Sequence, residues 1–181
     1  MGCGKSSVGK ILATLLPECR LIDLDTYIEE KQGKNIPEIF NEYGEAAFRR
    51  MEREALEEIF SDKSRPRAIL SLGGGTVTSE QCRQLIRQHT DCFYLRATTD
   101  TLLDNLEGHS DGRPMLNPTQ PVEAQSTETS SEREALRRRI ESLMQTRSPQ
   151  YLATAHHIID IDGLSFAQIA EAVEANILNI K

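Results

Sequence analysis

Short β-prone runs alternate with amphipathic helical patterns along the chain, and this alternation is the strongest constraint on its fold. Polar residues or glycine bound each run, and the runs cover residues 20–24, 68–72, 92–95 and 157–161. Apolar residues at helical spacing separate them, most clearly over residues 5–16 and 48–60. This order favours a layered α/β fold with helices on a mostly parallel sheet. A length of 181 residues predicts one domain, residues 1–181.

The composition argues against several classes of protein. With 38% apolar and 27% charged residues, the chain resembles ordinary globular proteins, and no apolar run approaches the roughly 18 residues of a membrane span. The net charge of −7 argues against a broad surface for nucleic acid. The 4 cysteines form no Cys-x-x-Cys pair, which favours reduced thiols over a zinc site or disulfides. We therefore expect a cytoplasmic protein whose partners include neither nucleic acid nor membrane.

The first seven residues, MGCGKSS, allow two interpretations. Met-Gly-x-x-x-Ser is the pattern for N-myristoylation of Gly2, with Cys3 as a second candidate for acylation. Gly-Lys-Ser is also the second half of a phosphate-binding loop, in which Lys5 would reach the β and γ phosphates and Ser6 would bind magnesium. The complete pattern G-x-x-x-x-G-K-[ST] would place its first glycine before residue 1. These residues alone do not decide between a lipidation signal, a phosphate-binding loop and a chance match.

Two groups of residues follow the first two β-prone runs. Asp23 and Asp25 end the first run, so we expect both carboxylates to point to the same side of a strand at the ligand-binding edge of the sheet. A magnesium nucleotide needs such a carboxylate, and an acceptor hydroxyl needs a base. The alternative is a solvated strand end that caps a helix near Tyr27. Three glycines, residues 73–75, follow the second run and allow close approach to a ligand.

One polar stretch, residues 117–131, contains two prolines and few apolar residues. So long a loop in a compact domain indicates a functional lid or a disordered insertion. Arg113 precedes the stretch, and Arg147 comes directly after the helical pattern that follows it. Arg49 lies on another amphipathic helix, where the alternative to a binding role is a solvated ion pair with a residue such as Glu45.

The segments GKSS, LIDLDTYIEE, EAAFRRME, LSLGGGTVT, GRPML and RSPQY together resemble shikimate kinase in their order and spacing. The resemblance covers residues 2–151, and it favours the phosphate loop over the lipidation signal. It implies a P-loop kinase of the nucleoside-monophosphate-kinase type that uses ATP and Mg²⁺. Its reaction would transfer the γ-phosphoryl group of ATP to the 3-hydroxyl of shikimate, a step toward chorismate and aromatic amino acids. The family-level expectation is a monomer.

The resemblance also implies a role for each candidate residue. Lys5 would hold the β and γ phosphates, Asp25 would hold the ring hydroxyls and act as the base, and Arg113 would offset charge during transfer. The metal would be bound by Ser6 and, through water, by Asp23. The nucleotide-binding residues would be Gly2, Cys3, Gly4, Lys5, Ser6, Ser7 and Arg113. The residues that bind shikimate would be Asp25, Arg49, Gly73, Gly74, Gly75 and Arg147.

The remaining expectations concern regions and departures from the family pattern. Residues 26–60 would form the acceptor-binding region, with Phe40, Phe48 and Glu52 shaping its pocket, and residues 112–131 would form the lid. The first, central strand and the front of the phosphate loop are absent, so we expect this chain to begin inside that loop and its sheet to have a central gap. Two alternatives stay open: another small-molecule kinase, such as a gluconate kinase, and a catalytically impaired nucleotide-binding module.

Overall fold

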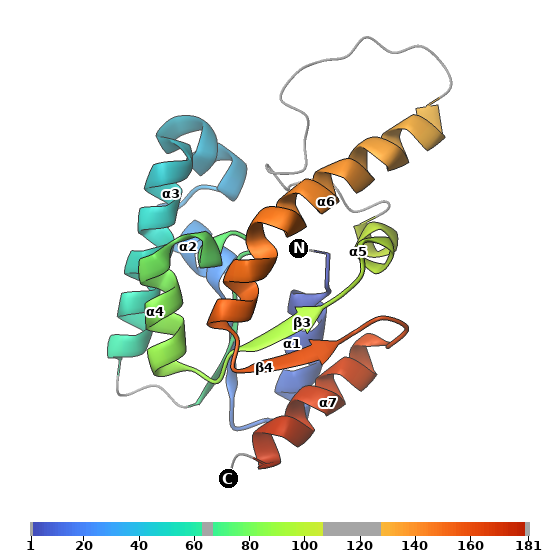
Figure 1. Cartoon of the computed structure of the whole chain (residues 1–181). Helices are drawn as coiled ribbons and strands as arrows, with labels where there is room; N and C mark the ends of the chain where they lie inside the picture. Colours follow the sequence, from blue (N-terminus) through green and yellow to red (C-terminus); the bar gives the residue numbers. More distant parts are fainter. Residues whose placement is uncertain (1, 63–66, 107–127, 180–181) are drawn as a thin grey trace.

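The computed structural model describes residues 2–62, 67–106 and 128–179, which form parallel strands flanked by helices (Figure 1). Strand β1 (Arg20–Asp23) pairs in parallel with β2 (Ala68–Ser71), and Asp23 lies opposite Ser71. Strand β3 (Phe93–Arg96) pairs in parallel with β4 (His157–Asp160). Within the described ranges these are two separate two-stranded sheets. The predicted α/β fold with parallel strands is therefore confirmed.

Helices connect and cover the strands. The helices of the described ranges are α1 (Lys5–Leu15), α2 (Leu24–Gln32), α3 (Ile36–Ser61), α4 (Glu80–His89), α5 (Thr99–Leu106), α6 (Glu128–Thr154) and α7 (Phe166–Asn179), with a short 3-10 helix, η1 (Thr76–Thr78). Local sequence explains several ends: Asn35 and Glu38 form a capping box at the start of α3, and Gly33 ends α2 with a φ of 63°. Helix α3 is kinked at Gly44, whose φ of 77° is not helical.

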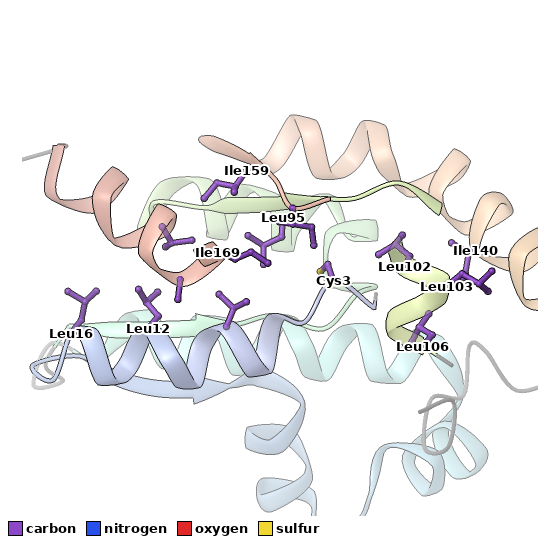
Figure 2. Packing of buried hydrophobic residues seen from close by; sticks show 14 residues of the cluster. Cys3, Leu12, Leu16, Leu95, Leu102, Leu103, Leu106, Ile140, Ile159 and Ile169 are labelled. Carbon is purple, nitrogen blue, oxygen red and sulfur yellow. The ribbon is translucent and has the colours of Figure 1, made fainter. Parts of the chain in front are cut away.

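Two apolar clusters hold these elements together. The first lies between α1 and the β3–β4 pair, and Figure 2 shows Leu12 of α1 facing Leu95 and Ile159 across it. The second packs β1 and α2 against α3 and α4, with Ile39 and Leu56 fully buried. Burial of a Leu or Ile side chain contributes about 1.5–3 kcal/mol. Both clusters reach the space between the two strand pairs, where Leu12 of the first cluster and Ile22 of the second line one cavity.

A cavity of about 540 Å³ lies between the two strand pairs. Residues of α1, β2, β3 and α7 line it, among them Leu12, Ile69, Phe93 and Val173. No ladder joins β2 to β3 in the part of the chain that the structure covers. The sheet is therefore interrupted at its centre, as the sequence led us to expect.

Most of the predicted lid lies outside the described residues, and so does Arg113. Residues 128–131, at the end of the predicted lid, are the first residues of α6. Its inward face carries Ile140, which is fully buried in the first cluster.

Candidate active site

The segment before α1 has the backbone of an anion-binding loop. Gly2 and Gly4 have φ angles of 70° and 73°, a conformation that residues with a Cβ rarely adopt. A Cβ on Gly4 would also lie 2.4 Å from Cε1 of Phe166. Helix α1 starts immediately afterwards at Lys5, so its free N–H groups and positive dipole end adjoin the loop. These features suit a phosphate group.

The side chain of Cys3 points away from this loop into the first apolar cluster (Figure 2). It is only 7% exposed, so a phosphate could meet the backbone of this residue but not its thiol. A buried thiol is also a poor acceptor for an acyl chain. The backbone of Gly2 is held by α5, because its carbonyl oxygen accepts a hydrogen bond of 2.9 Å from Nδ2 of Asn105.

Ser6 and Asp23, the predicted metal-binding residues, are in direct contact. The Ser6 hydroxyl donates to Oδ2 of Asp23 over 3.0 Å. A hydroxyl and a carboxylate are the side-chain oxygens that Mg²⁺ uses when nucleotide phosphates and water supply its other ligands. Among the residues described, no group of three or more His, Cys, Asp and Glu could hold a metal alone. The pair therefore fits a metal that arrives with a nucleotide.

Asp25 lies in the first turn of α2 and not on the strand with Asp23, so our prediction of two carboxylates on one strand face was wrong. The reason is local: Oδ1 of Asp23 accepts a hydrogen bond from the N–H of Asp25 over 3.1 Å, which ends the strand and caps the helix. The carboxylates are still neighbours. Burial, followed by repulsion from Asp23 and Glu52, raises the pKa of Asp25 to about 6, while Lys5 opposes the shift. A carboxylate with this pKa is suited to accept a proton near neutral pH.

Arg49 is held by two carboxylates of its own helix. Its Nη1 donates to Oε2 of Glu52 over 2.6 Å, and its Nη2 donates to Oε1 of Glu45 over 3.0 Å. Its Nε is buried and has no hydrogen-bond partner among the described residues. A Cβ on Gly75 would lie 2.3 Å from Nη2 of Arg49, so the guanidinium sits directly against the glycine loop. The guanidinium is thus fixed at the glycine loop and keeps one donor, Nε, without an acceptor among the described residues.

Arg147 reaches the same glycine loop from α6. It is 6% exposed, and its Nη1 lies 3.3 Å from the carbonyl oxygen of Gly74. The Tyr151 hydroxyl donates to that oxygen over 2.5 Å. On the other side of the loop, a Cβ on Gly73 would lie 2.8 Å from Oδ1 of Asp25. The loop therefore brings Asp25 and the two predicted arginines to one place.

The aromatic residues expected in the acceptor pocket also adjoin this place. The Phe40 and Phe48 rings have centroids 4.7 Å apart, and the Arg49 guanidinium carbon lies 5.5 Å from the Phe48 centroid. We did not predict a role for Tyr151. Its position four residues after Arg147, on the same helix face, was a usable signal.

Parallel strands and a glycine-lined loop at the start of α1 define the class of protein as a P-loop kinase, and the two arginines at the glycine loop beside Asp25 suit a small acidic acceptor. The family model described as shikimate kinase matches residues 1–177. The chain belongs to the shikimate kinase family, and so to the ATP-dependent kinases that phosphorylate shikimate with Mg²⁺.

Curated relatives and solved structures agree with this assignment. A shikimate kinase of Thermus thermophilus is 34% identical over 173 residues, which are 96% of this chain and 83% of the relative. That of Chlorobaculum tepidum is 37% identical over 180 residues, or 97% of this chain and 87% of the relative. The structure of shikimate kinase from Acinetobacter baumannii in complex with shikimate is 30% identical, covers 100% of this chain and 90% of its own, and has a TM-score of 0.83.

Replacing Gly75 with alanine should weaken shikimate binding without unfolding the protein. The backbone of Gly75 has an ordinary φ of −105°, so the new Cβ adds no strain there, but it meets the end of the flexible Arg49 side chain. Arg49 must move, and a shift of about 1 Å in a binding group can cost up to about 10²-fold. We expect the KM for shikimate to rise about ten- to a hundredfold. Steady-state kinetics and a thermal melt test this. An unchanged KM for shikimate, or an equal rise in the KM for ATP, would contradict this prediction.

Proposed function

We propose that the chain transfers the γ-phosphoryl group of ATP to the 3-hydroxyl of shikimate, and that the pocket around residues 73–75 binds the acceptor. The main support for this proposal is that Arg49 and Arg147 both lie against one glycine loop beside Asp25. A planar carboxylate suits a guanidinium, and Nε of Arg49 is a buried donor in need of an acceptor. Shikimate has a carboxylate on one side of its ring and hydroxyls on the other. It could therefore contact the arginines and Asp25 at once.

In this proposal Asp25 hydrogen-bonds the ring hydroxyls and takes the proton of the one that attacks the γ-phosphorus. Lys5 binds the β and γ phosphates, and backbone amides of residues 2–7 cradle them. Ser6 would hold Mg²⁺ and Asp23 would support it through water, and the metal would offset phosphate charge there.

Arg113 and the lid of residues 112–131 keep the roles that the resemblance implies: offsetting charge during transfer and excluding water. Residues 26–60 form the acceptor-binding region of a single domain.

We also propose that a further parallel strand fills the cavity between β2 and β3 and carries the front half of the phosphate loop into Gly2, so that this chain begins inside that loop. Three observations support it. Strands β2 and β3 each have one partner within the described ranges, and both line the cavity between them. The cavity lining is largely apolar, as a buried central strand requires. The two loop glycines already have the conformation of a phosphate loop.

A coupled ADP-release assay tests both proposals. It compares the 181-residue chain with a version extended upstream by the in-frame encoded residues, each with ATP, Mg²⁺ and shikimate, gluconate or no acceptor. If shikimate-dependent ADP release is restored or strongly raised in the extended version, the result supports both the kinase reaction and the added strand. Equal activity in the two versions contradicts the added strand but keeps the kinase. Folded protein without shikimate-dependent activity in either version overturns the kinase and favours an impaired nucleotide-binding module.

We further propose that the protein works as a monomer in the cytoplasm and without nucleic acid. Its net charge of −7 is unfavourable for a polyanion. No helix in the described ranges is long and apolar enough to cross a membrane. Light scattering gives the oligomeric state, and retention on heparin at low salt would contradict the exclusion of nucleic acid.

A further inference from the structure

Glu52 is a carboxylate in the middle of α3 that is 0% exposed. A charge buried this completely requires partners for its oxygens, because burial without them costs several kcal/mol. Both oxygens have one: Oε2 accepts from Nη1 of Arg49 over 2.6 Å, and Oε1 accepts from the Thr76 hydroxyl over 2.5 Å. Thr76 is also 0% exposed. Water therefore does not compete with the threonine for this oxygen.

The hydrogen bond from Thr76 limits the rotation of the Glu52 carboxylate. The terminal torsion of a glutamate side chain is broad, so a carboxylate held at one oxygen can turn. Fixing Oε1 fixes Oε2, and with it the place of Nη1 of Arg49. The other partner of Arg49, Glu45, has a side chain that is 52% exposed, and such a pair is a weak restraint.

Thr76 is itself held in place by the glycine loop. Its N–H donates to the carbonyl oxygen of Gly73 over 3.2 Å, and it is the first residue of η1. The loop thus contacts Arg49 directly at Gly75, and also indirectly through Thr76 and Glu52. The plane of the guanidinium matters, because a two-point hydrogen bond to a carboxylate requires both groups to be coplanar.

We propose that Thr76 is a positioning residue for the acceptor: its hydroxyl fixes Glu52, and Glu52 holds the Arg49 guanidinium in the plane that receives the carboxylate of the substrate. This inference rests on the proposed role of Arg49 in binding shikimate. The Thr76 hydroxyl bonds Glu52 and not the nucleotide loop. Its effect therefore falls on the acceptor side of the site, where Glu52 holds Arg49 and also raises the pKa of Asp25. The nature of the side chain at residue 76 thereby sets how tightly an acidic acceptor is held.

The test compares Thr76→Val, which keeps the shape and loses the hydroxyl, with Thr76→Ser, which keeps the hydroxyl. Leaving a buried acceptor unsatisfied costs enough to change an equilibrium by about ten- to a hundredfold. We expect Thr76→Val to raise the KM for shikimate about tenfold. The KM for ATP should change by less than about twofold, and Thr76→Ser should restore the wild-type KM for shikimate. Thr76→Ala, a second variant without the hydroxyl, carries the test if the valine methyl prevents folding.

Thr154→Val is the matched control. Thr154 is 1% exposed, and its hydroxyl donates to the carbonyl oxygen of Gln150 over 2.7 Å, so the same chemical group is lost from an equally buried site. This variant should leave both KM values unchanged. A wild-type KM in Thr76→Val, an impaired Thr76→Ser, or equal rises for shikimate and ATP would overturn the positioning role. Absence of shikimate-dependent activity in the wild-type enzyme would instead overturn the proposed function.

Discussion

Replacing Asp25 with asparagine is expected to lower the kcat for shikimate phosphorylation by about 10²–10⁴-fold, the usual contribution of a positioned base. Asparagine has nearly the same shape, so the pocket and the phosphate loop should stay intact, but it cannot take up the proton of the acceptor hydroxyl. Asp160→Asn is the control, because this aspartate of β4 pairs with Arg96 of β3 and its side chain is 65% exposed. Initial rates of ADP release measure both. A kcat within about threefold of wild type in Asp25→Asn would exclude Asp25 as the base.

In the wild-type enzyme, kcat/KM for shikimate should depend on pH through the titration of Asp25. Burial, then the charges of Asp23 and Glu52, raises the pKa of Asp25 to about 6. Below that pH the base is protonated, so kcat/KM for shikimate should fall about tenfold per pH unit. The residual activity of Asp25→Asn should lack this acidic limb. A wild-type profile that is flat from about pH 7 to about pH 5 would contradict the assignment.

The same substitution should stabilise the fold at neutral pH. Because the pKa of Asp25 is raised from 3.8 to about 6, the folded state binds its proton more tightly than the unfolded state, and stability from this group is lost as pH rises through that window. At about 1.4 kcal/mol per pKa unit, the ionised aspartate costs up to about 3 kcal/mol above about pH 6. Asp25→Asn removes that cost. Urea unfolding should show the gain at about pH 8 and its disappearance near about pH 4.

The positions of the helices and strands could largely be predicted because the signals for them are local. Gly4 and Pro17 bracket α1, and the structure starts that helix at Lys5 as expected. Each of the four described strands overlaps its predicted run, with ends that differ by one residue at most. The gap at the centre of the sheet was also expected, but from the family resemblance and not from any local pattern.

The details that sequence could not supply depend on contacts between distant residues. Whether Asp25 continues a strand or begins a helix depends on the Asp23 side chain, which can bond its own backbone or point outward. The hydroxyl of Thr76 and the carboxylate of Glu52 are 24 residues apart, and no spacing rule connects a helix to a later 3-10 turn. Phe166 begins α7 and is 38% exposed, and its ring lies against Gly4 at the other end of the chain, a contact that no local pattern indicates.

Replacing Arg49 with methionine should raise the KM for shikimate by about 10²-fold or more and also destabilise the protein. The first effect is the loss of charged hydrogen bonds to the acceptor, about 1.5–3 kcal/mol for each. The second arises because Glu52, with no exposure, would keep only Thr76 as a partner. Breaking a buried ion pair from one side costs about 3–5 kcal/mol. Arg50→Met is the matched control. Arg50 is the next residue, its side chain is 63% exposed, and its Nε lies 3.8 Å from Glu54, a pair worth about 0–1 kcal/mol.

A double variant separates the two effects. In Arg49→Met with Glu52→Leu, neither buried charge is left unpaired, and replacing a whole buried pair by apolar side chains is often neutral for stability. Urea unfolding should therefore show recovery of part of the stability lost in Arg49→Met, because the buried Thr76 hydroxyl still loses its acceptor. The KM for shikimate should stay high because the cation is still missing. If the double variant recovered both the stability and the wild-type KM for shikimate, Arg49 would act only by balancing the charge of Glu52. A KM that rises equally in Arg50→Met would mean that general positive charge, and not the guanidinium at the glycine loop, attracts the acceptor.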